Sequence, residues 1–172
     1  MRKINRAYLY SSVSLGLALH MTVLGHVKVF GAKPDIMLLL VVFFGLFGAK
    51  GMGLEAGIVS GVLRDVFSSG PFGVNTVILA GLGFLTEVIG PRVYRESGAA
   101  QFSLTFSMYF LYSAAYHIFG SAVSRPLSLL GGTVPGPAGA FAASVFSGAL
   151  YTSVAALFIF RWLTRYFGLE EY

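Results

Sequence analysis

The sequence predicts an all-α polytopic membrane protein, in which six transmembrane helices form a bundle and residues 1–172 make a single integral membrane domain. First, 56% of the residues are hydrophobic and only 11% are charged, whereas roughly a quarter of the residues of a soluble domain are charged. Second, the 22 glycines and 16 phenylalanines suit membrane helices, which pack closely through small residues. Third, long apolar runs recur between short polar turns. The chain therefore has too little charge to cover a soluble surface.

The composition also limits the chemistry. The chain has no cysteine, which excludes disulfides, a thiol nucleophile and a cysteine-based metal site. The three histidines, His20, His26 and His117, are not spaced as metal ligands on one helix. The sequence also lacks a GxSxG motif, a phosphate-binding loop and paired carboxylates at mid-span. We therefore predict a protein that is not an enzyme and has no cofactor and no metal site.

A spanning helix needs about 20 apolar residues, with roughly 17 to 25 the usual range. By this measure the six spans lie at about residues 7–27, 35–49, 53–67, 74–90, 102–123 and 138–160. The first span follows the basic segment MRKINR, as in a signal peptide, but the apolar run is long and no clean cleavage site follows it. We therefore interpret this first segment as an uncleaved signal anchor.

The second span has turn residues at both ends. Pro34 suits the first position of a helix, where its missing amide hydrogen has no consequence. Asp35 follows in the first turn, where a carboxylate meets the positive end of the helix dipole. The span is short, which implies local thinning of the bilayer or ends covered by protein. The turn after it is Lys50-Gly-Met-Gly.

The third span has a ridge of glycines at Gly53, Gly57 and Gly61. Their spacing of four residues places them on one face, which predicts close packing against a neighbouring helix. The span ends at a turn of residues 68–73, SSGPFG. The fourth span then has Glu87 near its end.

The last two spans have regular faces. Four aromatic side chains follow a helical spacing in the fifth span: Tyr109, Tyr112, Tyr116 and Phe119. Small residues recur every four positions in the sixth span, and they include Ser144 and Gly148. Residues 161–166, RWLTRY, then combine basic and aromatic side chains, which is typical of an interfacial anchor.

Lysine and arginine lie mostly between the apolar runs, so they indicate membrane topology rather than binding to nucleic acid. Six spans place both termini on one side, and cytoplasmic termini put eight basic residues inside and three outside. Those inside are Arg2, Lys3, Arg6, Lys50, Arg92, Arg95, Arg161 and Arg165, and those outside are Lys28, Lys33 and Arg125. The positive-inside rule thus predicts cytoplasmic N- and C-termini.

Ionisable side chains within spans usually face the interior of a bundle. Arg64 and Asp65 are adjacent, so they point about 100° apart on a helix and cannot pair with each other. We expect Arg64 to pair with Asp35 and Asp65 to cap backbone amides of the 68–73 turn. This predicts a structural polar network at the ends of three helices; the alternative is contact with a ligand or partner.

Glu55 and Glu87 lie near the inner ends of the third and fourth spans. Lys50 and Arg92 are within reach, so we expect interfacial ion pairs. A proton or cation relay is disfavoured because it needs carboxylates at mid-membrane depth.

The aromatic stripe of the fifth span has two interpretations. It is either packing or lipid-facing surface, or it forms a groove for a partner helix or the wall of a small cavity. We take the candidates for a partner interface from the fifth and sixth spans, and these are Tyr109, Tyr112, Tyr116, Phe119, Ser144 and Gly148.

One stretch has a recognisable pattern. Lys33-Pro34-Asp35 precedes an unbroken apolar run, Gly57 and Gly61 follow, and residues 63–75 read LRDVFSSGPFGVN. This pattern, mainly over residues 33–87, resembles the family of rod shape-determining protein MreD. The chain length, the basic N-terminus and the six predicted spans also agree with that family. Four residues match positions of the family pattern: Asp35, Asp65, Pro71 and Gly73.

The resemblance implies a non-enzymatic component of the elongation machinery in the bacterial inner membrane. Members of that family associate with MreC, and through it with RodA, a class B penicillin-binding transpeptidase and MreB, and they support rod shape and lateral peptidoglycan synthesis. The family is similar in fold to the substrate-binding subunits of energy-coupling-factor transporters. An alternative is therefore a substrate-capture subunit of such a vitamin transporter, which would hold a small ligand. Fold similarity alone does not decide between the two.

Overall fold

The computed structural model describes residues 6–22, 34–68, 70–93, 97–128 and 138–167. Over these residues the chain is entirely helical, without strands. The helices are α1 (Arg6–Thr22), α2 (Ile36–Phe47), α3 (Met52–Phe67), α4 (Val74–Ile89), the short 3₁₀ helix η1 (Gly90–Arg92), α5 (Gly98–Ser128) and α6 (Ala138–Tyr166).

The helix bounds differ from the predicted spans mainly in the second half of the chain. Helices α2, α3 and α4 begin and end within two residues of the ranges predicted for them. In contrast, α5 begins at Gly98 and reaches Ser128, so Arg125 lies in a helix and not in the predicted loop. Helix α6 continues to Tyr166, because the basic and aromatic anchor contains no residue that stops a helix. Residues 23–27 of the first predicted span lie outside the described residues.

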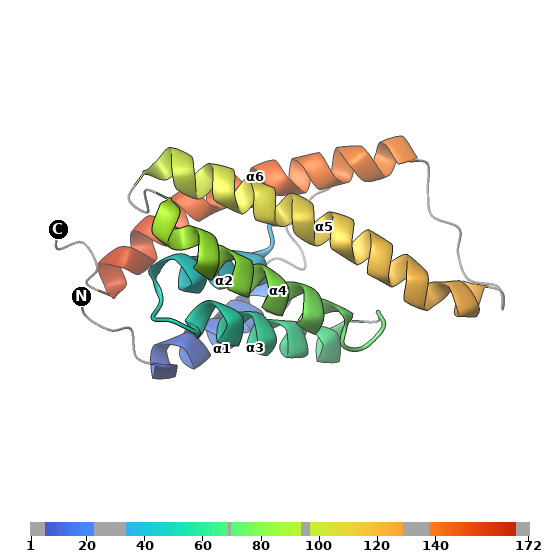
Figure 1. The fold of residues 1–172 in the computed structure, drawn as a ribbon, viewed down its shortest axis with the longest axis horizontal. Coiled ribbons are helices and arrows are strands. Elements are labelled where there is room, and N and C mark those ends of the chain that lie inside the picture. The colour runs from blue at the N-terminus through green and yellow to red at the C-terminus, as the bar shows by residue number, and fades with distance from the viewer. Residues whose placement is uncertain (1–5, 23–33, 69, 94–96, 129–137, 168–172) are drawn as a thin grey trace.

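Consecutive helices run in opposite directions, as Figure 1 shows from end to end. Helix α1 begins and α6 ends at the same end of the bundle, where the rings of Tyr8 and Phe167 lie 5.5 Å apart. We call this the terminal end and the opposite one the far end. Both α5 and α6 extend past the far ends of α3 and α4 (Figure 1).

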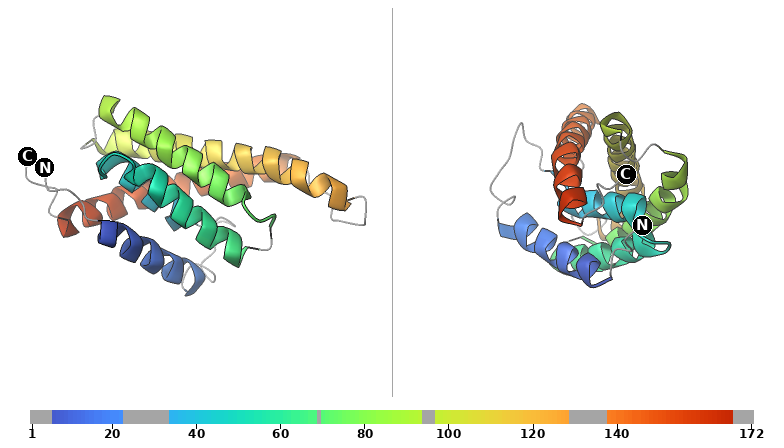
Figure 2. Two further views of the ribbon diagram at one scale, coloured as in Figure 1. Left: turned by 60° about the horizontal axis from the view of Figure 1, so that its bottom comes forward. Right: turned by 90° about the vertical axis from the view of Figure 1, so that its left-hand side faces the viewer.

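The shortest helix, α2, is at the centre. It contacts each of the other five α-helices, and Figure 2 shows it enclosed by them in the view along the bundle. Ten consecutive residues, from Met37 to Leu46, are buried, as expected for a helix that is apolar on all sides. Phe43 and Phe44 are among the largest fully buried side chains, and Phe43 packs against Phe160 of α6.

Helices α3 and α4 form the most extensive helix pair in the bundle, and glycines allow it. A Cβ atom added to Gly53 would lie 2.6 Å from the carbonyl oxygen of Gly83 in α4 and 2.8 Å from Cα of Gly45 in α2. One added to Gly57 would lie 2.7 Å from Cα of Ala80. Any side chain at these positions would meet backbone of another helix, so this face of α3 packs directly on α4.

Two segments are long and apolar enough to cross a membrane by length and composition, considering only the described residues: Val74–Arg92 and Val145–Tyr166. Helix α2 is apolar but has only 12 residues. Helix α3 has 16 residues and contains Glu55, Arg64 and Asp65. Crossing of a membrane by the other four predicted spans stays a prediction.

Candidate functional site

The polar side chains predicted to form a network lie at the far ends of α2 and α3. Asp35 is the N-cap of α2, and its Oδ1 atom accepts a hydrogen bond from the amide of Leu38 at 3.1 Å. Its Oδ2 atom accepts a hydrogen bond from Nη1 of Arg64 in an ion pair. Asp35 is only 5% exposed. A single carboxylate therefore caps one helix and joins it to the next.

Asp65 caps the adjacent helix. Its two carboxylate oxygens accept hydrogen bonds from the backbone amides of Asn75 and Thr76, at 3.1 and 2.9 Å, and from their side chains, at 2.9 and 2.6 Å. Both amides are in the first turn of α4, beyond the 68–73 turn where the cap was predicted. The reason is physical: the first amides of a helix have no partner within the helix.

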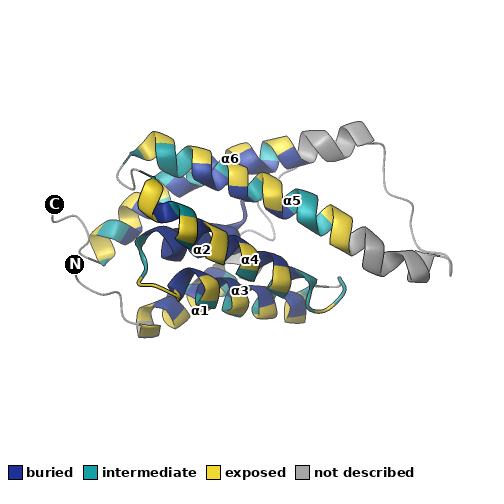
Figure 3. Cartoon of the chain, viewed as in Figure 1, coloured by how far each residue is buried: buried dark blue, intermediate teal, exposed yellow. Residues whose placement is uncertain are grey.

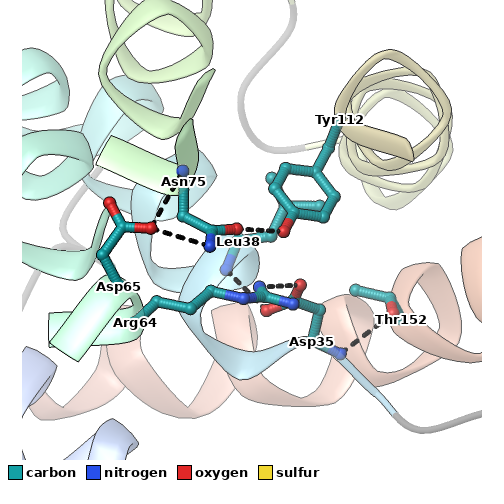
Figure 4. Close-up of polar contacts among 7 residues, drawn as sticks. All are labelled: Asp35, Leu38, Arg64, Asp65, Asn75, Tyr112 and Thr152. Carbon is teal, nitrogen blue, oxygen red and sulfur yellow. Dashed lines mark hydrogen bonds and ion pairs between the residues drawn. The ribbon is translucent and has the colours of Figure 1, made fainter. Parts of the chain in front are cut away.

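Tyr112 brings α5 into the network. Its hydroxyl donates a hydrogen bond of 2.6 Å to Oδ1 of Asn75, and the guanidinium carbon of Arg64 lies 4.9 Å from the centre of its ring, which is a cation–π contact. The backbone amide of Asp35 donates to the hydroxyl of Thr152 in α6 at 3.2 Å. Figure 4 shows these contacts converging from five helices, α2 to α6.

Sequence reasoning placed Asp35, Arg64 and Asp65 together but missed the roles of Asn75, Tyr112 and Thr152. A polar residue within an apolar span needs a partner, which is a signal that such residues lie in a network. This signal does not identify the partner, because the two residues of a pair can be far apart in the chain, as Tyr112 and Asn75 are, at 37 residues. Thr152 also has the four-residue spacing of the small residues of α6, and this spacing does not indicate a hydrogen bond.

The two glutamates lie at the terminal end and have other partners than Lys50 and Arg92. Glu55 accepts a hydrogen bond from the Tyr10 hydroxyl and forms an ion pair of 3.5 Å with Arg6. Glu87 accepts a hydrogen bond of 2.6 Å from the amide of Gly51. Helix α1 packs along α3, which brings Tyr10 and Arg6 to Glu55.

Replacing Glu55 by alanine is expected to have a small effect. The Arg6 side chain is 74% exposed and that of Glu55 is 24% exposed, and such pairs contribute about 1 kcal/mol or less. The amount of folded protein in membranes, measured by in-gel fluorescence of a fused reporter, should stay close to that of the wild type. A severe loss would show that Glu55 does more than hold α1.

The residues predicted for a partner interface occupy different places. Tyr112 is buried, Tyr109 packs with its hydroxyl end on Gly148, and the Tyr116 hydroxyl lies against Gly70. Only Phe119 among the four aromatic residues is well exposed, at 52%. The side chain of Ser144 lies outside the described part of the chain. The tyrosines thus face the interior, a placement that the packing interpretation of this stripe anticipates.

Phe119 contributes to an apolar hollow between α5 and the beginning of α4. The hollow has a volume of about 360 Å³ and is lined by Phe72, Gly73, Val74, Val77, Ile78 and Phe119. All of these residues are apolar, so the hollow offers no side-chain group for acid–base chemistry.

The network lies at the far ends of three helices but near the middle of two others. Asp35 precedes α2, Arg64 is in the last turn of α3, and Asn75 is in the first turn of α4. Tyr112, in contrast, is followed by 16 further residues of α5, because the helix ends at Ser128. These correspond to about 24 Å at 1.5 Å per residue. The α5–α6 pair thus continues well past the ion pair.

The described polar network joins the ends of neighbouring helices. No group of three or more histidine, aspartate or glutamate side chains there could hold a metal ion. The carboxylates of Asp35 and Asp65 hydrogen bond to helix ends, and Tyr112 hydrogen bonds to Asn75, which rigidifies a bundle. The arrangement therefore resembles a structural clasp between helices.

Comparisons with known proteins give one informative result. No curated protein and no solved structure matches the chain, so the similarity to energy-coupling-factor subunits is not shown. The family model of rod shape-determining protein MreD, in contrast, matches residues 1–158. This range contains the whole buried network and all of helices α1 to α5. A match over that much of the chain, together with the all-helical fold, shows that this protein belongs to the MreD family of rod shape-determining proteins.

Proposed function

We propose that the protein is a non-enzymatic scaffold of the bacterial elongation machinery. It crosses the inner membrane six times, with both termini in the cytoplasm, and directly binds an MreC-like membrane protein. RodA, a class B penicillin-binding transpeptidase and MreB belong to the same complex. Its role is to support rod shape and lateral peptidoglycan synthesis. Membership of the MreD family supports the role in rod shape, and the exposed apolar side chains of the bundle support its place in a membrane.

The observation that carries the proposal is the contrast between the interior and the outer faces. Polar side chains of five helices are joined inside the bundle, whereas large apolar side chains cover outer faces, which are yellow in Figure 3. On α3 these are Leu54, Ile58, Val62 and Val66. An apolar surface of this extent needs lipid or another protein against it. A scaffold that spans the membrane has both.

The face of α6 is the surface that we propose for the partner's membrane helix. Its exposed residues recur every four positions and are each 39% to 74% exposed: Phe146, Leu150, Val154, Phe158 and Trp162. Neighbouring helices leave this stripe open over about four turns. Large side chains at such spacing can interlock with those of a second helix.

Depletion in rod-shaped cells tests the role, and crosslinking tests the partner. Depleted cells should become round and regain rod shape when the gene is supplied again; normal rods after complete depletion would contradict the proposal. A photoreactive amino acid at Val154 of α6 should crosslink to the MreC-like protein. The same amino acid at Val62 of α3, which is similarly exposed, is the matched control and should not. Equal crosslinking from both positions would remove the assignment to α6.

A further inference from the structure

The Arg64 guanidinium retains hydrogen-bond donors that the bundle does not use. A guanidinium has five N–H donors, and Asp35 accepts a bond from Nη1. Within the described residues, no acceptor bonds to Nε or Nη2 of Arg64. The Tyr112 ring covers one face of the group, but 27% of the Arg64 side chain remains exposed. In a region of low dielectric, unused donors on a cation are unfavourable and favour an additional acceptor.

The Tyr109 hydroxyl is the second unused donor close to this site. A Cβ atom added to Gly148 would lie 2.8 Å from Cζ of Tyr109, so the tip of this tyrosine rests on the backbone of α6. Gly148 is one helical turn from Thr152, which binds the amide of Asp35. The Tyr109 hydroxyl thus contacts α6 one turn away from the residue that binds Asp35. No hydrogen bond to that hydroxyl is found in the part of the chain that the structure describes.

The Arg64–Asp35 ion pair lies at the far ends of α2 and α3. Arg64 is in the last turn of α3, and α2 begins only at Ile36, so neither helix continues past the pair. Along α6, the step from Thr152 to Gly148 also leads toward the far end, where that helix begins. Figure 4 shows the guanidinium next to Asp35, with Thr152 on the other side of Asp35.

We propose that the free edge of the Arg64 guanidinium and the Tyr109 hydroxyl form a binding site for an acidic group, a carboxylate or a phosphate. Arginine presents two parallel N–H donors to such groups, and these bonds are strong because both partners are charged. Asp35 accepts a hydrogen bond from Nη1 of this guanidinium. The site is additional to the scaffold function and does not depend on it.

Thermal unfolding of the purified full-length protein tests the site. The protein in an uncharged detergent is heated in sodium phosphate, sodium acetate or sodium chloride at matched pH and ionic strength. A second arm compares nanodiscs of phosphatidylcholine with nanodiscs that also contain phosphatidylglycerol, because the acidic group can be a free anion or a lipid phosphate. Tyr109→Phe removes only the hydroxyl. Tyr116→Phe is the matched control, because Tyr116 is on the same helix as Tyr109 and its hydroxyl lies against Gly70 instead.

Phosphate or acetate should raise the Tm of the wild type and of Tyr116→Phe by about 5 °C when the anion is at about 100 times its dissociation constant. Tyr109→Phe should lose most of this shift. The same pattern in the phosphatidylglycerol arm alone would assign the site to a lipid headgroup. An equal shift in all three proteins, or no shift in either arm, would overturn the proposal. Because Tyr109→Phe keeps the ring and its packing, loss of folding does not confuse the result.

Discussion

Arg64→Ala is expected to reduce the amount of folded protein in the membrane severalfold. The substitution removes the guanidinium that forms an ion pair with the buried carboxylate of Asp35, and it removes the cation–π contact with Tyr112. Breaking a buried ion pair by removing one partner costs roughly 3–5 kcal/mol. This cost is a large fraction of the free energy of unfolding of a typical domain. Quantitative immunoblots of membrane fractions, with transcript levels held equal, measure the effect.

A second substitution separates charge from packing. In the double variant Asp35→Asn and Arg64→Gln, both charges are absent and hydrogen bonding between the two side chains remains possible. We expect it to recover a large part of the abundance that Arg64→Ala loses, since neither residue is then a buried unpaired ion. Wild-type abundance of Arg64→Ala together with loss of partner binding would instead place Arg64 in the interface and contradict its role in the clasp.

Local chemistry predicted the parts of this network that depend on sequence neighbours. Pro34 and Asp35 predicted that a helix begins here with a carboxylate at its positive end, but α2 begins only at Ile36, so Asp35 is its N-cap and Pro34 lies before the helix. The adjacency of Arg64 and Asp65 predicted two different partners, and the structure gives them two. Glycine spacing in α3 similarly predicted a face for close packing, since every fourth residue of a helix lies on one side.

The contacts that sequence reasoning missed depend on how distant helices are placed. Nothing local to Tyr112 distinguishes a residue that binds Asn75 from one that faces lipid, because both suit an aromatic stripe. Glu55 meets Arg6 and Tyr10 only because α1 packs along α3. The extension of α5 and α6 past the network also depends on tertiary structure. Hydropathy identifies the residues of each span, but it does not show where the ends of neighbouring helices lie relative to one another.

Gly57→Ala is expected to destabilise the protein although alanine is the better helix former. The added methyl group would meet the backbone of Leu79 and Ala80 in α4, and backbone cannot move aside as the end of a flexible side chain can. The two helices must separate, and overpacking of this kind costs typically about 1–3 kcal/mol. Thermal unfolding of the purified protein should show a lower Tm than the wild type.

The matched control is Gly81→Ala in α4, because a Cβ atom there would meet no atom within 4 Å. Alanine is favoured over glycine in a helix by about 1 kcal/mol, so this variant should unfold at the same temperature as the wild type or slightly higher. The two substitutions make the same chemical change in helices that pack against each other, and their predicted effects have opposite signs. If both variants raised the Tm, helix propensity would outweigh packing, and the glycine face of α3 would not be the contact that holds α3 against α4.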